Sequence, residues 1–152
     1  MAMRFNYTRL APAGFQAMQA LETSIRESGL APALVHLLKL RCSQLNGCAF
    51  CIDLLWQDLR ALGETEQRLY SLDAWREAPF YAERERAALA YAEACTNLHD
   101  GHVPDAVYEQ VRAQFSEAEV AQLTFVVAAI NAWNRLGIAS RAEPGHYQPK
   151  RS

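Results

Sequence analysis

The sequence predicts an all-α protein, and three observations support this fold class. Two prolines each precede a stretch in which apolar residues recur every three or four positions, and each stretch ends at a glycine: Pro12 with Gly29, and Pro32 with Gly47. Proline is favoured at the start of a helix and glycine just after its end. No stretch alternates polar and apolar residues as a half-buried strand would. At 152 residues, 51% of them hydrophobic, the chain has the length and the apolar content of a single domain.

Each expected helix has its own boundary signals. Asn46-Gly47 ends the second helix and Gly63 ends the third. Ser116 and Glu119 have the spacing of a capping box, in which the hydroxyl and the carboxylate bind free backbone N–H groups at a helix start. We expect helices at 12–28, 32–46, 48–62, 83–98, 104–115 and 116–138, short helical pieces within 64–79, and a tail at 141–152.

The last expected helix is apolar on too many sides to lie on the surface of a monomer. Such a helix is either the central helix of a bundle or buried against another subunit. Asn131 and Asn134 lie one turn apart on it, and they are candidates for a buried polar network or a subunit contact. The apolar positions are Val120, Leu123, Phe125, Val126, Val127, Ile130 and Trp133.

Composition excludes several classes of function. Fifteen basic and 17 acidic residues give a net charge of -2, without the basic surplus of a nucleic-acid binder. No long apolar run follows the N-terminus, and the longest apolar stretch, 125–130, is far shorter than a membrane span. We therefore expect a soluble cytoplasmic protein, whose cysteines are in a reducing compartment.

The chemical centre of the sequence is a Cys-x-x-Cys motif. Gly47 ends one expected helix, Cys48 lies where the next begins, and Cys51 follows one turn later on the same face. The two sulfurs are then within disulfide reach. The free N–H groups and the positive end of the helix dipole stabilise a thiolate there. A thiolate attacks peroxides and disulfides, and a second cysteine one turn away resolves the product.

Three other interpretations of the motif compete with this one, and two of them stay open at this point. Cys48 and Cys51 could form half of a zinc site, which needs two more ligands; Cys42 and Cys95 are candidates, but both lie within expected helices in apolar surroundings. The pair could also be two buried structural thiols. A thioredoxin-like motif requires a preceding strand, which this chain does not provide. The sequence indicates neither a resident metal nor an organic cofactor.

The residues around the motif carry a wider resemblance. The run 38–53, followed by Ala61-Leu62-Gly63-Glu64, resembles the core of the alkyl hydroperoxidase AhpD-like group of the carboxymuconolactone decarboxylase superfamily. Further similar segments are 75–81, 83–90 and 130–135, so that the resemblance extends from about residue 6 to about residue 145 of a single 1–152 domain.

This resemblance implies an oxidoreductase that assembles as a homo-oligomer, a trimer or hexamer. Cys51 corresponds to the cysteine that meets the hydroperoxide, and Cys48 to the one that resolves it into an intramolecular disulfide. The electrons would come from a dithiol donor, such as a lipoyl group or a thioredoxin-type protein. The decarboxylase branch lacks this cysteine pair, which argues against lactone decarboxylation.

The chain departs from the family at the proton relay. The family has a glutamate twelve residues before the first cysteine and a histidine four residues after the second; here these positions hold His36 and Leu55. One hypothesis is that His36 replaces both groups and takes the thiol proton. The alternative is a histidine satisfied by a backbone carbonyl. Loss of the relay also leaves open a slow redox sensor or a scaffold oligomer that kept the fold.

Overall fold

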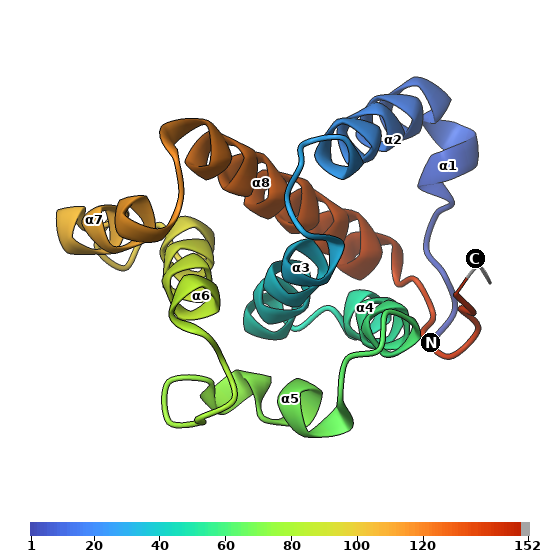
Figure 1. The fold of residues 1–152 in the computed structure, drawn as a ribbon. Helices are drawn as coiled ribbons and strands as arrows, with labels where there is room; N and C mark the ends of the chain where they lie inside the picture. Colours follow the sequence, from blue (N-terminus) through green and yellow to red (C-terminus); the bar gives the residue numbers. More distant parts are fainter. Residues whose placement is uncertain (150–152) are drawn as a thin grey trace.

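A computed structural model describes residues 1–149 of the chain, and within them it contains eight α-helices, one short 3-10 helix and no strand (Figure 1). The predicted all-α fold class is confirmed. The last three residues of the expected tail, 150–152, lie outside the described residues. The helices are α1 (Tyr7–Leu10), α2 (Pro12–Arg26), α3 (Pro32–Asn46), α4 (Ala49–Ala61), α5 (Glu66–Tyr70), η1 (Leu72–Ala74), α6 (Glu83–Thr96), α7 (Asp105–Gln114) and α8 (Glu117–Ser140).

The local signals set most of the boundaries. Gly47 adopts a left-handed conformation with φ 68° and ends α3 where the sequence predicts. The capping box of Ser116 and Glu119 is present at the start of α8. The prediction missed α1, a single turn whose first N–H groups bind the side chain of Asn6. It also extended α2 and α6 two residues too far.

Helix α8 runs through the middle of the molecule and packs against α2, α3, α4, α6 and α7 (Figure 1). Its buried residues include Leu123, Val126 and Ile130. This central position is the first of the two alternatives for the all-round apolar pattern. Phe125 and Ile138 remain exposed on it, at 55% and 48% of their surface. The expected oligomer stays a prediction.

A buried ion pair joins α3 to α6. Nε of Arg41 donates to Oε1 of Glu93 over 2.7 Å, and both residues are buried. Trp75 and Arg76 donate to the same carboxylate. Burial acts to raise the pKa of Glu93, but the hydrogen bonds from Trp75, Arg41 and Arg76 outweigh it and lower that pKa.

Replacing Glu93 with Gln should therefore lower the free energy of unfolding at pH 7 by about 3 kcal/mol, because Arg41 keeps its buried charge and loses its main partner. Because the pKa of Glu93 is lower in the folded than in the unfolded protein, its carboxylate stabilises the fold at pH values above the unfolded pKa. This stabilisation is lost as the pH falls through the folded pKa. The difference in free energy of unfolding between the wild type and Glu93→Gln, measured by urea unfolding, should then become smaller below about pH 4.5. As a control, Glu66→Gln, which removes an exposed pair with Arg60, should cost less than about 1 kcal/mol. A gap that is independent of pH would contradict this account.

Candidate functional site

The turn between α3 and α4 places the cysteine pair. The N–H of Cys48 donates to the carbonyl of Ser43 over 3.0 Å, which closes the end of α3 around Gly47. Cys48 is then the N-cap of α4, and its Sγ accepts from the N–H of Cys51 over 3.4 Å. The first cysteine thus lies at the positive end of a 13-residue helix, as the sequence predicts.

Cys48 and Cys51 form a disulfide in this structure, with their Cα atoms 5.3 Å apart. The predicted proximity of the two sulfurs is confirmed. Cys51 exposes 6% of its surface and Cys48 only 1%. Both cysteines are therefore almost completely buried.

An amide network fixes the turn against α8. Nδ2 of Asn46 donates to Oδ1 of Asn131 over 2.9 Å and to Oδ1 of Asn134 over 2.8 Å. Nδ2 of Asn134 in turn donates to Oγ of Ser43 over 2.9 Å. Asn131 and Asn134 therefore form a polar network, one of their two expected roles, in which Asn134 and Ser43 are buried and Asn46 and Asn131 are half-buried. The network holds the residues just before Cys48.

Gly137 lets α8 approach both sulfurs. A Cβ at this position would lie 3.2 Å from Sγ of Cys48 and 3.6 Å from Sγ of Cys51. Glycine costs a helix interior about 1 kcal/mol relative to alanine, so it needs a reason to be there. The close packing of the sulfurs against the backbone of α8 supplies one.

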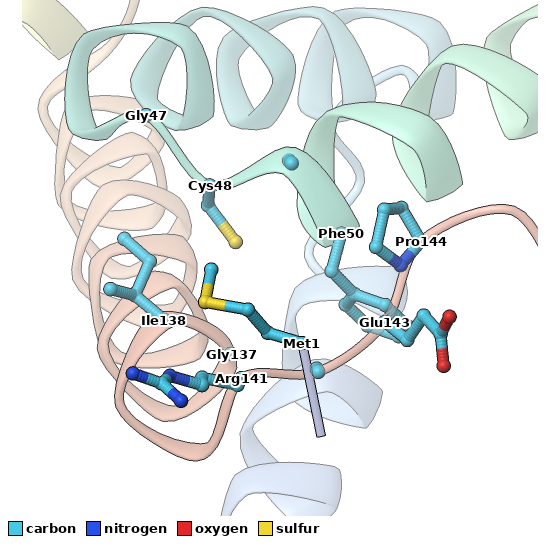
Figure 2. A pocket seen from close by; sticks show the side chains of 11 residues that line it. Met1, Gly47, Cys48, Phe50, Gly137, Ile138, Arg141, Glu143 and Pro144 are labelled. Atoms are coloured by element: carbon cyan, nitrogen blue, oxygen red, sulfur yellow. The ribbon is translucent and has the colours of Figure 1, made fainter. Parts of the chain in front are cut away.

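A first cavity, of about 240 Å³, lies on the Cys48 side of the pair. Figure 2 shows the Cys48 side chain directed toward Met1, with Phe50 and Gly137 nearby. The backbone of Arg4 binds the carbonyl of Ser140, which keeps the N-terminal segment beside the end of α8. The remaining lining residues are Gly47, Ala49, Ile138, Arg141, Ala142, Glu143 and Pro144.

A second cavity, of about 310 Å³, lies on the Cys51 side, between α2, α3, α4 and α8. Phe50 and Gly137 border both cavities. Tyr7 and Trp133 at its edge form an aromatic cluster with Phe15, with ring centroids 6.1 to 6.4 Å apart. The other lining residues are Glu22, His36, Lys39, Leu54, Leu55 and Ile130.

Two opposite charges lie in this largely apolar wall. Nζ of Lys39 is 2.5 Å from Oε2 of Glu22, and Nε1 of Trp133 donates to Oε1 of Glu22 over 2.9 Å. Lys39 exposes only 6% of its surface. Sequence analysis missed this pair. Lys39 lies three residues after His36 and so on the same face of α3, a signal that was present, but nothing in the sequence links it to Glu22.

His36 lines the same cavity as Cys51, as the hypothesis of a substitute relay requires. Its Nδ1 is 2.8 Å from the carbonyl of Pro32, the contact that the alternative interpretation expects. Its Nε2 is 3.7 Å from Oδ2 of Asp58. Among the described residues, the polar contacts of His36 go to these two groups and to neither cysteine. A catalytic role for His36 stays a prediction.

Leu55, at the family's histidine position, is buried and lines the cavity, so it makes the surroundings of Cys51 more apolar. Trp56 does not contribute to that wall in the described structure. It is 36% exposed, and the guanidinium of Arg60 lies 5.9 Å from its ring centroid.

The other two cysteines lie apart from the site as free thiols. Cys42 is completely buried, and its Sγ accepts from the hydroxyl of Thr96 over 3.2 Å. Burial raises the pKa of Cys42 to about 12 and also raises that of Cys95.

Within residues 1–149, no group of three or more His, Cys, Asp or Glu side chains is arranged to hold a metal ion. No helix in that part of the chain is long and apolar enough to cross a membrane.

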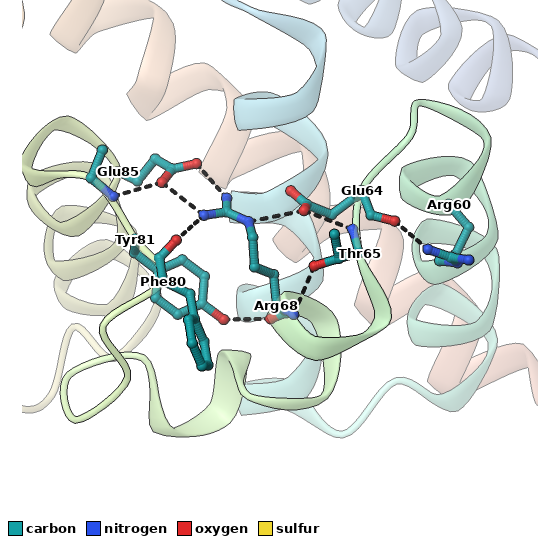
Figure 3. A network of polar contacts seen from close by, with 8 residues as sticks. Arg60, Glu64, Thr65, Arg68, Phe80, Tyr81 and Glu85 are labelled. Carbon is teal, nitrogen blue, oxygen red and sulfur yellow. Dashed lines mark hydrogen bonds and ion pairs between the residues drawn. The ribbon is translucent and has the colours of Figure 1, made fainter.

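A second charged cluster, centred on Arg68, holds the segment between α4 and α6 (Figure 3). Its guanidinium donates to Glu64 over 2.9 Å and to Glu85 over 2.6 Å, and it also binds the carbonyl of Phe80. The ring of Tyr81 lies 4.9 Å from the guanidinium carbon. These groups satisfy one another, so the cluster has a structural role.

Comparison with known proteins settles the family. Residues 12–94, which include α2, α3, α4 and nearly all of α6, match the model of the carboxymuconolactone decarboxylase family. The chain belongs to this family. The uncharacterised protein YdfG of Bacillus subtilis is 42% identical over 139 residues, which cover 91% of this chain and 95% of YdfG.

Solved structures of similar proteins agree with this membership. An Agrobacterium tumefaciens protein of unknown function, proposed to be the antioxidant defence protein AhpD, superimposes with a TM-score of 0.92. It is 39% identical, over 96% of this chain and 100% of that one. The debrominase Bmp8 has a TM-score of 0.77 at 20% identity, over 86% of this chain and 70% of its own, and so shares the fold.

In this family member, Gly137→Ala should lower the free energy of unfolding of the oxidised protein, because the disulfide is covalently held and cannot easily move away from the new Cβ. Gly14→Ala is the matched control, because Gly14 lies within α2 and an added Cβ would meet no atom within 4 Å. The free energy of unfolding of this variant should rise by about 1 kcal/mol. Urea unfolding of both oxidised variants makes the comparison. Equal stabilisation by the two alanines would show that the contact has no energetic weight.

Proposed function

We propose that this protein is a thiol-dependent peroxidase that reduces hydroperoxides through a Cys48–Cys51 dithiol–disulfide cycle. The observation that carries the proposal is that Cys51 borders a cavity of about 310 Å³, while Cys48 lies within bonding distance at the helix start. A cavity of this size and apolar lining fits an organic hydroperoxide. The similar protein proposed to be AhpD gives independent support.

The proposed cycle assigns a separate role to each sulfur. The thiolate of Cys51 attacks the terminal oxygen of the hydroperoxide, so that an S–O bond forms, the O–O bond breaks and an alcohol leaves. Cys48 then attacks the sulfenic acid of Cys51, which forms the disulfide and releases water. A dithiol donor, a lipoyl protein or a thioredoxin-type protein, returns two electrons by thiol–disulfide exchange and is itself oxidised to a disulfide.

The remaining parts of the proposal concern assembly and place. A homo-oligomer, trimer or hexamer, follows from the family resemblance, and exposed Phe125 and Ile138 on α8 provide apolar surface for it. We also propose a cytoplasmic location, because recycling by a dithiol donor needs a reducing compartment.

Replacing either cysteine with serine should abolish steady-state hydroperoxide consumption, and the two variants should differ in what accumulates. Cys48→Ser leaves Cys51 without a resolving thiol, so one equivalent of hydroperoxide should leave a sulfenic acid that a dimedone probe labels and mass spectrometry maps to Cys51. Cys51→Ser should give no such adduct. Cys42→Ser, with a buried and protonated thiol in the parent, is the control and should retain activity.

Full consumption by both active-site variants would refute the peroxidase proposal. If wild-type protein forms the disulfide only over hours, the redox-sensing or scaffold alternative applies instead. Its signature would be a change of oligomeric state between the reduced and the oxidised protein, measured by light scattering.

The proposal includes His36 as the acceptor of the Cys51 proton. In a Cys48→Ser background, His36→Leu should then raise the pKa of the Cys51 thiol by about one unit, because the proposed proton acceptor in the same cavity is lost. The pH dependence of iodoacetamide alkylation measures this pKa. An unchanged value would remove His36 from the mechanism.

A further inference from the structure

The ion pair of Lys39 and Glu22 is unusual for its position. Both residues line the cavity that Cys51 borders, and the rest of that wall is mainly aromatic or aliphatic. Removing two charges from water costs several kcal/mol per ion, and well-packed apolar residues in their place are often as stable or more so. A charge pair at such a place is therefore poorly explained by stability alone.

The geometry of the pair holds both side chains in place. Glu22 uses one carboxylate oxygen for Lys39, at 2.5 Å, and the other for the indole N–H of Trp133, at 2.9 Å. The carboxylate is thus held by α3 and α8 at once, although it comes from α2. Lys39 has three N–H bonds to donate, and Glu22 takes one of them, so its ammonium retains donors for a group that enters the cavity.

We propose that Lys39, held by Glu22, is the acid and electrostatic partner of Cys51 in the peroxidase cycle: its ammonium stabilises the thiolate and protonates the oxygen that leaves. This inference rests on the proposed function and adds a residue to it. It assigns to a lysine–glutamate pair on α3 and α2 the positive charge that the family position at Leu55 lacks.

The protons balance as follows. Cys51 enters the reaction as a thiolate and Lys39 as an ammonium. When the O–O bond breaks, the alkoxide takes a proton from Lys39 and leaves as the alcohol, while Cys51 becomes a sulfenic acid. When Cys48 attacks Cys51, its thiol gives its proton to Lys39. Lys39 passes a proton to the departing hydroxide, which leaves as water. Lys39 is then neutral and takes up one proton from water. This proton balances the one that Cys51 lost when it became a thiolate.

Other titratable groups face Lys39 and belong in the interpretation of any pH profile. His36 lies one turn away on α3, and its Nε2 approaches Asp58 on α4. Although burial acts to raise the pKa of Asp58, its bonds to His36 and Tyr147 and the charges of His36 and Lys39 lower it. On α1, burial raises the pKa of Tyr7, so that phenol stays neutral at physiological pH.

Two substitutions test the proposal because they should move one quantity in opposite directions. In a Cys48→Ser background, Lys39→Met keeps the aliphatic stem and removes the positive charge, so it should raise the pKa of the Cys51 thiol by about one unit or more. Glu22→Gln keeps the size and an acceptor for Trp133 but leaves Lys39 unneutralised, so it should lower that pKa. Iodoacetamide alkylation across pH, mapped to Cys51 by mass spectrometry, reads out both shifts.

With Cys48 intact, Lys39→Met should slow single-turnover oxidation by cumene hydroperoxide at pH 7 by about tenfold or more. Lys39→Arg should restore the thiol pKa. Arg41→Met is the matched control, because it removes a buried ion pair with Glu93 from the same helix two residues away, outside the cavity. It should lower the midpoint of thermal unfolding and leave the thiol pKa unchanged.

A purely structural ion pair predicts a different pattern, in which both variants lower the unfolding midpoint and neither moves the thiol pKa. That result, or shifts of the same sign, would overturn the proposal. Its failure is distinguishable from failure of the peroxidase proposal. Opposite pKa shifts in a protein that does not consume hydroperoxide would support stabilisation of the thiolate by Lys39 but refute both the peroxidase and the acid role of Lys39. Turnover with an unresponsive pKa would support the peroxidase and refute the proposal for Lys39.

Discussion

The close contact between α8 and the start of α4 is the constraint on which the site depends. Both sulfurs pack against backbone at Gly137, and the amides of Asn131 and Asn134 hold the preceding turn through Asn46. One helix therefore sets both the position of the turn and the depth of the disulfide. Because α8 also packs against α2, α3, α6 and α7, the position of α8 beside the cysteine pair is fixed by the rest of the bundle.

The electrostatics of Cys51 result from opposing effects. Its apolar surroundings, including Leu55, disfavour a thiolate, whereas the beginning of α4 favours one. In our proposal the ammonium of Lys39 favours the thiolate as well. Glu22 lies opposite Lys39 in an ion pair and so offsets its positive charge. A nucleophile that is both shielded from water and stabilised by nearby charge suits a reaction with a small neutral oxidant.

Local sequence signals were sufficient for the cysteine motif and for most of the helices, but not for α1 or for the ends of α2 and α6. Gly47 and Ser116 act on their immediate neighbours, so the ends of α3 and the start of α8 follow from a few residues. The pairing of Lys39 with Glu22 was not predictable, because it arises only in the folded bundle, where Glu22 on α2 reaches Lys39 on α3 and Trp133 on α8. Asn134 stands between these cases: its register on the last helix suggested a buried network, but only the fold identifies Asn46 and Ser43 as its partners.

The two spare cysteines have a consequence for repeated oxidation. A chain with four thiols has several ways to form a wrong disulfide each time its active pair opens. Cys42 is enclosed in the core and remains protonated at any physiological pH, since its pKa is raised to about 12, and the pKa of Cys95 is raised as well. Exchange requires a thiolate. In the proposed cycle, the raised pKa values of these two thiols would therefore disfavour their exchange with the Cys48–Cys51 disulfide, and oxidation would form one reversible bond.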